Sequence, residues 1–336
     1  MVSGVQYSLA WILLMFVASK GYGTSLDTFP PPGEMVDMGG YRMHLIIEGR
    51  DKEGPTVVFF HGAGDIALHW NLILPEVGEF ARAVAIDQNG EGWSEHGHGA
   101  AIPQQVYDSR ESLQRGGLKP PFILVGHSLG GILAMEFAYT YRKDVAGVVL
   151  VDATHPDVVL RVYDPEKGMS NWTRMRLLAD SEIPEVKTRG LEQPKKIDSF
   201  LPQRDFGIQL RPFSPDDQRR FHWIYNERPW TYVKGQGNTF EAEVFQEMFE
   251  HLDRYHLGDI PLVVISGGRK VDPVGDEKWY TEQLIAHSHA LQKEYLNWSN
   301  NSRHLIARKS GHQIHLENPS LIVKIISDLI KGLNKE

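Results

Sequence analysis

The sequence predicts an α/β protein with a doubly wound, mostly parallel sheet and an inserted helical cap. Continuous apolar runs of strand length recur along the chain, as expected for strands that are buried on both faces of a parallel sheet. Helix-patterned stretches separate these runs, and glycine-rich turns follow several of them. From residue 157 to residue 258 the apolar runs stop, which indicates an insertion in the α/β core.

Composition narrows the class of protein. The chain has 336 residues, which suits one large domain with an insertion or two domains. A hydrophobic content of 41% and a charged content of 23% are typical of a globular protein. The net charge of −8 argues against a nucleic-acid partner. The absence of cysteine excludes disulfides, thiol catalysis and cysteine-based zinc sites.

Residues 1–23 differ from the rest of the chain. Val5–Ala18 is almost entirely apolar, but it is shorter than the stretch of about 20 residues that spans a bilayer. It fits the apolar region of a signal peptide, although no Lys or Arg precedes it, so an uncleaved N-terminal anchor is the alternative. We expect export, secreted or periplasmic, or a membrane tether through residues 5–18. Residues 24–34, with Pro30-Pro31-Pro32, are expected to be a linker.

The expected core occupies residues 35–156 and 259–336. It begins with a hairpin at 35–48 whose turn is Gly39-Gly40. Strands are then predicted at 56–60, 81–86, 123–125, 145–151, 260–266 and 304–307. Helices are predicted at 104–116, 132–141, 277–291 and 320–333. This alternation implies right-handed crossovers in one sheet.

The insertion at 157–258 is expected to be a helical cap, with helices at 172–178, 215–223 and 241–255. It is rich in aromatic residues, which favours either a lidded apolar pocket or simply a core of the cap's own. The residues concerned are Phe200, Phe206, Phe213, Trp223, Tyr225, Trp230 and Tyr232.

The segment from Phe122 to Tyr141 has the pattern of a strand, a sharp turn and a helix, with Ser128 at the apex. Gly126 and Gly130 stand two residues on either side, where larger side chains would collide in so tight a turn. This is the context that a nucleophile elbow requires, and it places the serine at a helix N-terminus that favours negative charge. A glycine-rich turn with an incidental serine is the alternative.

Six segments occur in the order seen in one large group of proteins. They are HGAG at 61–64, DQNGEGWS at 87–94, GHSLGG at 126–131, VVLVDATHP at 148–156, IPLVVISGG at 260–268 and SGHQIHLENP at 310–319. On these segments the chain resembles the α/β-hydrolase superfamily, in its serine-nucleophile form with a cap inserted after the sixth strand.

The resemblance implies a catalytic triad. Ser128 is the expected nucleophile, and His312, in the turn after the last strand, is the expected base. The orienting acid follows the sixth strand in some members and the seventh in others. Asp152 in DATHP is closer to the pattern of capped relatives, whereas Asp272 is displaced by one residue from the usual position after the seventh strand. Asp152 is therefore favoured, and Asp272 remains the alternative. The backbone N–H groups of Ala63 and Leu129 are the expected oxyanion hole.

Other polar residues of these segments are expected to be structural. They are Asp87, Gly90, Gly92 and Ser94 in the second segment, and His61, His127 and His315. His96 and His98 could suggest a metal, but two loop histidines without a third ligand favour a solvated loop. No metal and no cofactor are predicted.

The expected function is therefore a serine hydrolase that cleaves an ester or related acyl bond of a small, apolar substrate. Proteins of the same fold also cleave carbon–carbon bonds, amides or lactones, or act as cofactor-free peroxidases, and the elbow does not separate these activities. A catalytically silent binding protein is a further alternative. The oligomeric state is left open.

Overall fold

The computed structural model describes residues 29–99, 101–164, 169–178, 210–226, 237–269 and 278–334. The apolar segment Val5–Ala18 lies outside these ranges. Among the helices within them, none is both long and apolar enough to cross a membrane.

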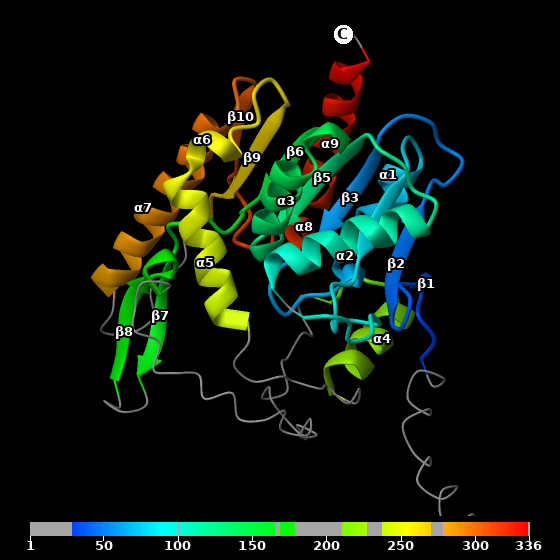
Figure 1. Ribbon diagram of the computed structural model, residues 1–336, viewed down its shortest axis with the longest axis horizontal. Coiled ribbons are helices and arrows are strands. Elements are labelled where there is room, and N and C mark those ends of the chain that lie inside the picture. The colour runs from blue at the N-terminus through cyan, green and yellow to red at the C-terminus, as the bar shows by residue number, and fades with distance from the viewer. Residues whose placement is uncertain are drawn as a thin grey trace, which may run out of the picture.

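An eight-stranded sheet forms the centre of the described chain (Figure 1). The strand order is β1 (Glu34–Asp37), β2 (Arg42–Glu48), β4 (Ala83–Ile86), β3 (Thr56–Phe60), β5 (Phe122–His127), β6 (Val145–Val151), β9 (Leu262–Gly267) and β10 (Ser302–Ala307). β2 runs antiparallel to both of its neighbours, and all other pairs are parallel. The predicted fold class is confirmed.

The central strands are buried on both faces, as their continuous apolar sequence predicts. In β3, Val57 and Phe59 pack into the hydrophobic cluster on one face of the sheet, and Val58 and Phe60 pack into the cluster on the other. Successive side chains of a strand point to opposite faces, so an uninterrupted apolar run supplies both clusters.

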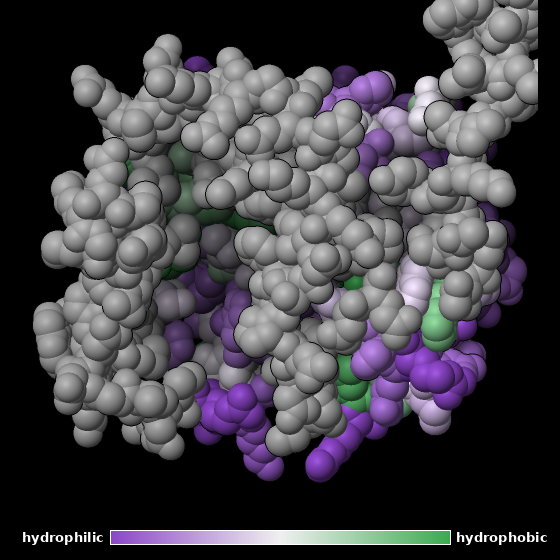
Figure 2. Space-filling view, turned by 90° about the horizontal axis from the view of Figure 1, so that it is seen from below, coloured by the Kyte–Doolittle hydropathy of each residue, from purple (hydrophilic) through white to green (hydrophobic). Residues whose placement is uncertain are grey.

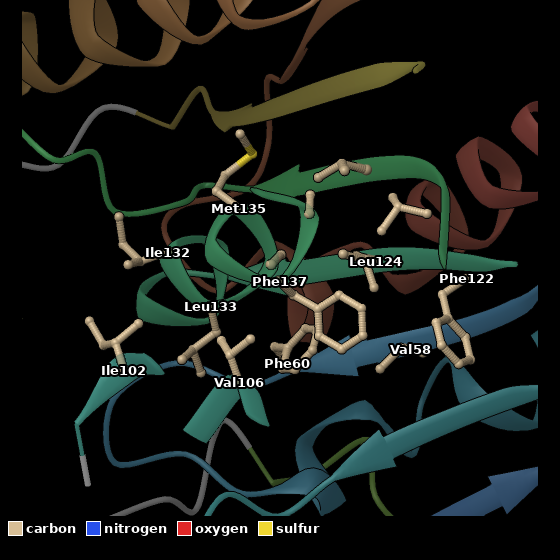
Figure 3. Close-up of a cluster of buried hydrophobic side chains, with 14 of the residues drawn as sticks. Val58, Phe60, Ile102, Val106, Phe122, Leu124, Ile132, Leu133, Met135 and Phe137 are labelled. Atoms are coloured by element: carbon tan, nitrogen blue, oxygen red, sulfur yellow. The ribbon is translucent and has the colours of Figure 1, made fainter. Parts of the chain in front are cut away.

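Helices cover both faces of the sheet. α2 (Ile102–Arg115) and α3 (Leu129–Thr140) cover one face, where Phe137 of α3 lies near Phe60 and Phe122 (Figure 3). The ring centroids of those two residues are 6.2 and 6.0 Å from that of Phe137. α1 (Leu74–Gly78) and α9 (Pro319–Leu333) contribute to the cluster on the other face. The core is therefore two apolar layers on one sheet.

The segment between β6 and β9 departs in part from the expected helical cap. α4 (Pro215–Asn226) matches the helix predicted at 215–223. α5 (Gly237–Glu250) and α6 (Leu252–Tyr255) together cover the helix predicted at 241–255. The helix predicted at 172–178 is wrong, because β7 (Val159–Asp164) and β8 (Met169–Arg174) pair as an antiparallel hairpin, and only a 3-10 turn, η3 (Met175–Leu178), follows. Backbone pairing with a second segment decides such a short stretch, and local sequence pattern does not contain that information.

The carboxyl ends of the parallel strands point towards β7, β8, α4 and α5, at the bottom of Figure 1. Figure 2 views the molecule from this side, and hydrophobic described residues are visible there in recesses between more hydrophilic ones. Aromatic residues of the insertion do enter the core, since Phe213 and Trp223 are buried in the cluster that contains α1 and α9. Phe200, Phe206, Trp230 and Tyr232 lie outside the described residues.

Candidate active site

Ser128 occupies the turn between β5 and α3. Its backbone has φ 51° and ψ −123°, a conformation that residues other than glycine rarely adopt. A Cβ added at Gly126 would lie 2.3 Å from the Gly130 carbonyl oxygen, and one added at Gly130 would lie 2.3 Å from that of Phe60. Both positions therefore require glycine, and the strained elbow that the sequence predicts is present.

Asp152 follows β6 beside this turn. The register pairs Val151 with His127, so the next residues, Asp152 and Ser128, are neighbours at the carboxyl edge of the sheet. The Asp152 N–H donates to the Ile265 carbonyl at 2.7 Å, and its Oδ1 accepts the Gly267 N–H at 2.9 Å. These bonds to β9 fix the carboxylate.

His312 lies in the turn after β10, and its Nδ1 is 2.7 Å from Asp152 Oδ2. Because a carboxylate can only accept, His312 donates Nδ1–H and its Nε2 keeps a lone pair. The His312 side chain is 52% exposed, so a substrate can reach it. The structure thus joins His312 to Asp152, whereas Asp272 lies outside the described residues.

The protonation of His312 depends on Asp152. Burial alone would lower the pKa of His312, but the Asp152 hydrogen bond, the Asp152 charge and the more distant Asp65 charge outweigh it, so the pKa is raised above 6.5. An opposite charge beside an imidazole favours the protonated form. The Asp152–His312 pair therefore strengthens this imidazole as a base.

The loop after β3 lies against the serine. A Cβ added at Gly62 would be 3.1 Å from the Ser128 Cβ, and the next residue, Ala63, is exposed. The buried His61 ring braces this loop, since its Nδ1 lies 2.9 Å from the Gly62 carbonyl and its Nε2 lies 3.4 Å from the Gln88 N–H. Leu129 is the first residue of α3. Both expected oxyanion donors therefore belong to segments that adjoin Ser128.

Asp87 organises the turn after β4. Its Oδ1 accepts the Ala67 N–H at 2.7 Å, and its Oδ2 accepts the Trp93 N–H at 2.8 Å and lies 2.7 Å from His44 Nδ1. A Cβ at Gly92 would collide with this carboxylate. The structural role predicted for Asp87 and Gly92 agrees with these contacts.

A pocket of about 300 Å³ opens beside His312, between the segment after β6 and α7 (Lys278–Glu294). His155, His287 and Gln292 line it together with apolar residues. Burial lowers the pKa of His155 to about 4, so this ring is neutral at pH 7. The sequence reasoning missed these three residues; His155 could have been noticed, because it lies three residues after Asp152 in the DATHP segment.

The fold and this geometry define a class of protein, and comparison with known proteins agrees. The α/β-hydrolase family description matches residues 57–325. The chain therefore belongs to the α/β-hydrolase family, and hydrolysis is the chemistry that this membership supports.

The individual relatives share a small part of their sequence with this chain. An uncharacterised protein of Mycobacterium tuberculosis (strain ATCC 25618 / H37Rv) is 31% identical over 254 residues, which cover 73% of this chain and 69% of that one. A thermophilic esterase from Thermogutta terrifontis superposes with a TM-score of 0.57 at 18% identity, over 89% of this chain and 98% of that one. The enol-lactonase from Burkholderia xenovorans LB400 superposes with a TM-score of 0.55 at 16% identity, over 89% of this chain and 100% of that one. At these identities the structural matches establish the fold alone.

Proposed function

We propose that this protein is a serine hydrolase that cleaves an ester or related acyl bond of a small substrate. Ser128 is the nucleophile, His312 the base, and Asp152 the acid that orients it. The observation that carries the proposal is the 2.7 Å contact between His312 Nδ1 and Asp152 Oδ2, next to a serine with a strained backbone.

The mechanism follows from the tautomer that Asp152 selects. With Nδ1–H donated to Asp152, Nε2 of His312 is free to take the Ser128 proton as the hydroxyl oxygen attacks the substrate carbonyl. The backbone N–H groups of Ala63 and Leu129 bind the oxyanion, and losing one such donor typically costs about 3 kcal/mol of transition-state stabilisation. His312 returns the proton to the leaving group, and water then releases the acyl group from Ser128.

Serine at the elbow favours acyl chemistry within this fold, because epoxide hydrolases and dehalogenases of the superfamily carry aspartate there. Cleavage of a carbon–carbon or amide bond, a cofactor-free peroxidase activity and a silent binding role are the alternatives that an assay must separate.

Labelling with a fluorophosphonate probe tests the nucleophile. We expect a covalent adduct at Ser128 in the native chain, and none in Ser128→Ala or His312→Ala, because a serine hydroxyl needs a base to react at neutral pH. Turnover of p-nitrophenyl acetate should fall by roughly 10⁴-fold or more in both variants. Mass spectrometry of the peptide locates the adduct, and circular dichroism verifies folding. An adduct that forms equally well without His312 would contradict the triad.

A series of p-nitrophenyl esters tests the size of the acyl group. We propose that the pocket beside His312 receives the acyl group. At about 300 Å³ it is at the small end of ligand sites, so kcat/KM should be highest for short acyl chains and fall for long ones. Activity that rises steadily to long acyl chains would contradict the small-substrate proposal while leaving the triad intact.

A further inference from the structure

Three polar side chains converge beneath the candidate active site. They are Asp65, His127 and His315, and one ligand atom from each lies within 4.8 Å of the other two. All three are at most 9% exposed. Each comes from a different segment of the site. Asp65 is two residues after Ala63 in the loop after β3, His127 ends β5 directly before Ser128, and His315 lies in α8 (Ile314–Glu317), three residues after His312.

The His127 tautomer leaves a lone pair in this cluster. His127 Nε2 lies 3.0 Å from the His312 carbonyl oxygen, which can only accept, so Nε2 carries the hydrogen. In the neutral ring Nδ1 is then an acceptor, yet it faces the Asp65 carboxylate, with 3.5 Å between Nδ1 and Oδ2. Nδ1 of His127 and Nδ1 of His315 are both buried without a hydrogen-bond partner among the described residues. Acceptors therefore face one another unless a proton or a metal ion lies between them.

The buried Asp65 carboxylate has only imidazole partners among the described residues. The ion-pair contacts of its carboxylate within the described part of the chain are with two imidazoles, His127 at 3.5 Å and His69 at 3.6 Å. No described Lys or Arg forms an ion pair with it. A buried carboxylate is stable only when it is paired or coordinates a metal.

The distances match ligands of one ion better than direct hydrogen bonds. Metal–ligand bonds of about 2.0–2.2 Å in a tetrahedron place neighbouring ligand atoms about 3.4 Å apart. The Asp65–His127 separation of 3.5 Å is close to this value, whereas hydrogen bonds between N and O are usually shorter. The widest separation that the cluster allows, 4.8 Å, would have to close by about 1.4 Å to reach this value, so a side chain has to move when the ion binds.

We propose that Asp65, His127 and His315 bind a divalent transition-metal ion of the zinc class. Two imidazoles and one carboxylate are a ligand set that such ions take. His69 Nε2 faces the other carboxylate oxygen and orients it, as outer partners of metal ligands do. A bound ion would connect the oxyanion loop, the end of β5 and α8, the three segments that carry these ligands.

Metal analysis of the full chain tests this proposal. Protein treated with EDTA and dialysed against Zn²⁺ or Co²⁺ should retain one equivalent, with a Kd below about 1 µM. Asp65→Asn and His315→Gln should each weaken binding by about 100-fold or more. His155→Gln is the matched control, because His155 is also buried with an unpartnered Nε2. The double variant His96→Gln/His98→Gln removes the competing loop histidines.

The outcomes separate cleanly. One equivalent of metal retained by both controls and lost in the cluster variants supports the site. No saturable binding, or binding that disappears only in the His96/His98 variant, overturns it. If the cluster variants do not fold, X-ray absorption at the zinc edge of the His96→Gln/His98→Gln variant decides: two imidazole ligands support the site, and fewer overturn it. Fluorophosphonate labelling of Ser128 is read separately, so loss of this proposal leaves the proposed hydrolase untouched.

Discussion

Ser128 and Asp152 share an unusual backbone conformation. They are the two non-glycine residues with positive φ in the described chain, at 51° and 42°. Such strain costs of the order of 1–3 kcal/mol at each residue and persists only where surrounding contacts enforce it. Here the Ser128 N–H donates to Val151, and the Ser128 carbonyl accepts the Thr154 N–H at 2.9 Å. Hydrogen bonds between Ser128 and the residues on either side of Asp152, and between Asp152 and β9, hold the two strained residues at the ends of neighbouring strands.

Replacing Asp152 by Asn should damage catalysis without damaging the fold. The amide oxygen can still accept the Gly267 N–H, but the NH₂ group would face His312 Nδ1 and select the wrong tautomer. We expect kcat to fall by roughly 10⁴-fold, as in other triads. Asp272→Asn is the comparison: a larger loss there than in Asp152→Asn would make Asp272 the acid. Thermal denaturation of both variants checks that the folded state survives.

The raised pKa of His312 predicts how kcat/KM falls on the acid side of its pH profile. His312 must be neutral to accept the Ser128 proton, so kcat/KM should fall as pH drops through the His312 pKa. That midpoint should lie above 6.5, because Asp152 stabilises the protonated ring. In Asp152→Asn the midpoint of the residual activity should move down. A midpoint that stays unchanged in this variant would show that another group controls the profile.

At the scale of elements, the junction of β5 and α3 depends on close backbone contact. Gly130 approaches the Phe60 carbonyl so closely that any side chain must displace β3 or the helix. Gly131 approaches Ala153 in the same way, with 2.3 Å from an added Cβ to that of Ala153. The elbow is thus shaped by its neighbours on both sides as much as by its own sequence.

Gly130→Ala should therefore destabilise the protein by about 1–3 kcal/mol and lower labelling of Ser128. Gly332→Ala is the matched control, because Gly332 lies in α9 with open space around its Cα and no positive φ. That substitution should be neutral, or stabilising by up to about 1 kcal/mol. Urea denaturation of the two variants measures the difference, and equal stabilities would argue against the tight contact.

At the scale of the whole molecule, the insertion starts shortly after β6 with a buried carboxylate that binds two arginines of the insertion. Asp157 is buried, and its carboxylate binds both Arg174 and Arg176, with 2.8 Å between Asp157 Oδ1 and Arg176 Nε. Across the molecule, the Tyr225 hydroxyl of α4 donates to the Gly64 carbonyl at 2.8 Å. The insertion therefore begins with ion pairs of its own, and α4 joins it to the oxyanion loop.

The N-terminal segment belongs to this scale as well. We propose that Val5–Ala18 directs export, so N-terminal sequencing of secreted protein should begin near residues 20–24. Membrane-associated protein that retains residues 1–19 would instead support the anchor. Soluble protein that retains them inside the cell would contradict both.

The sequence by itself determined the α/β class, the approximate positions of the strands of the main sheet and the elbow, because these depend on local periodicity and on glycines that are near in sequence to Ser128. It also named Ser128, His312 and Asp152, whose catalytic roles stay predictions. Only the tertiary structure decided that Asp152 lies against His312, 160 positions further along the chain, and that residues 159–174 form a hairpin. Only the tertiary structure also brings Asp65, His127 and His315 together. Contacts between distant segments depend on strand order and register, and no local pattern encodes these.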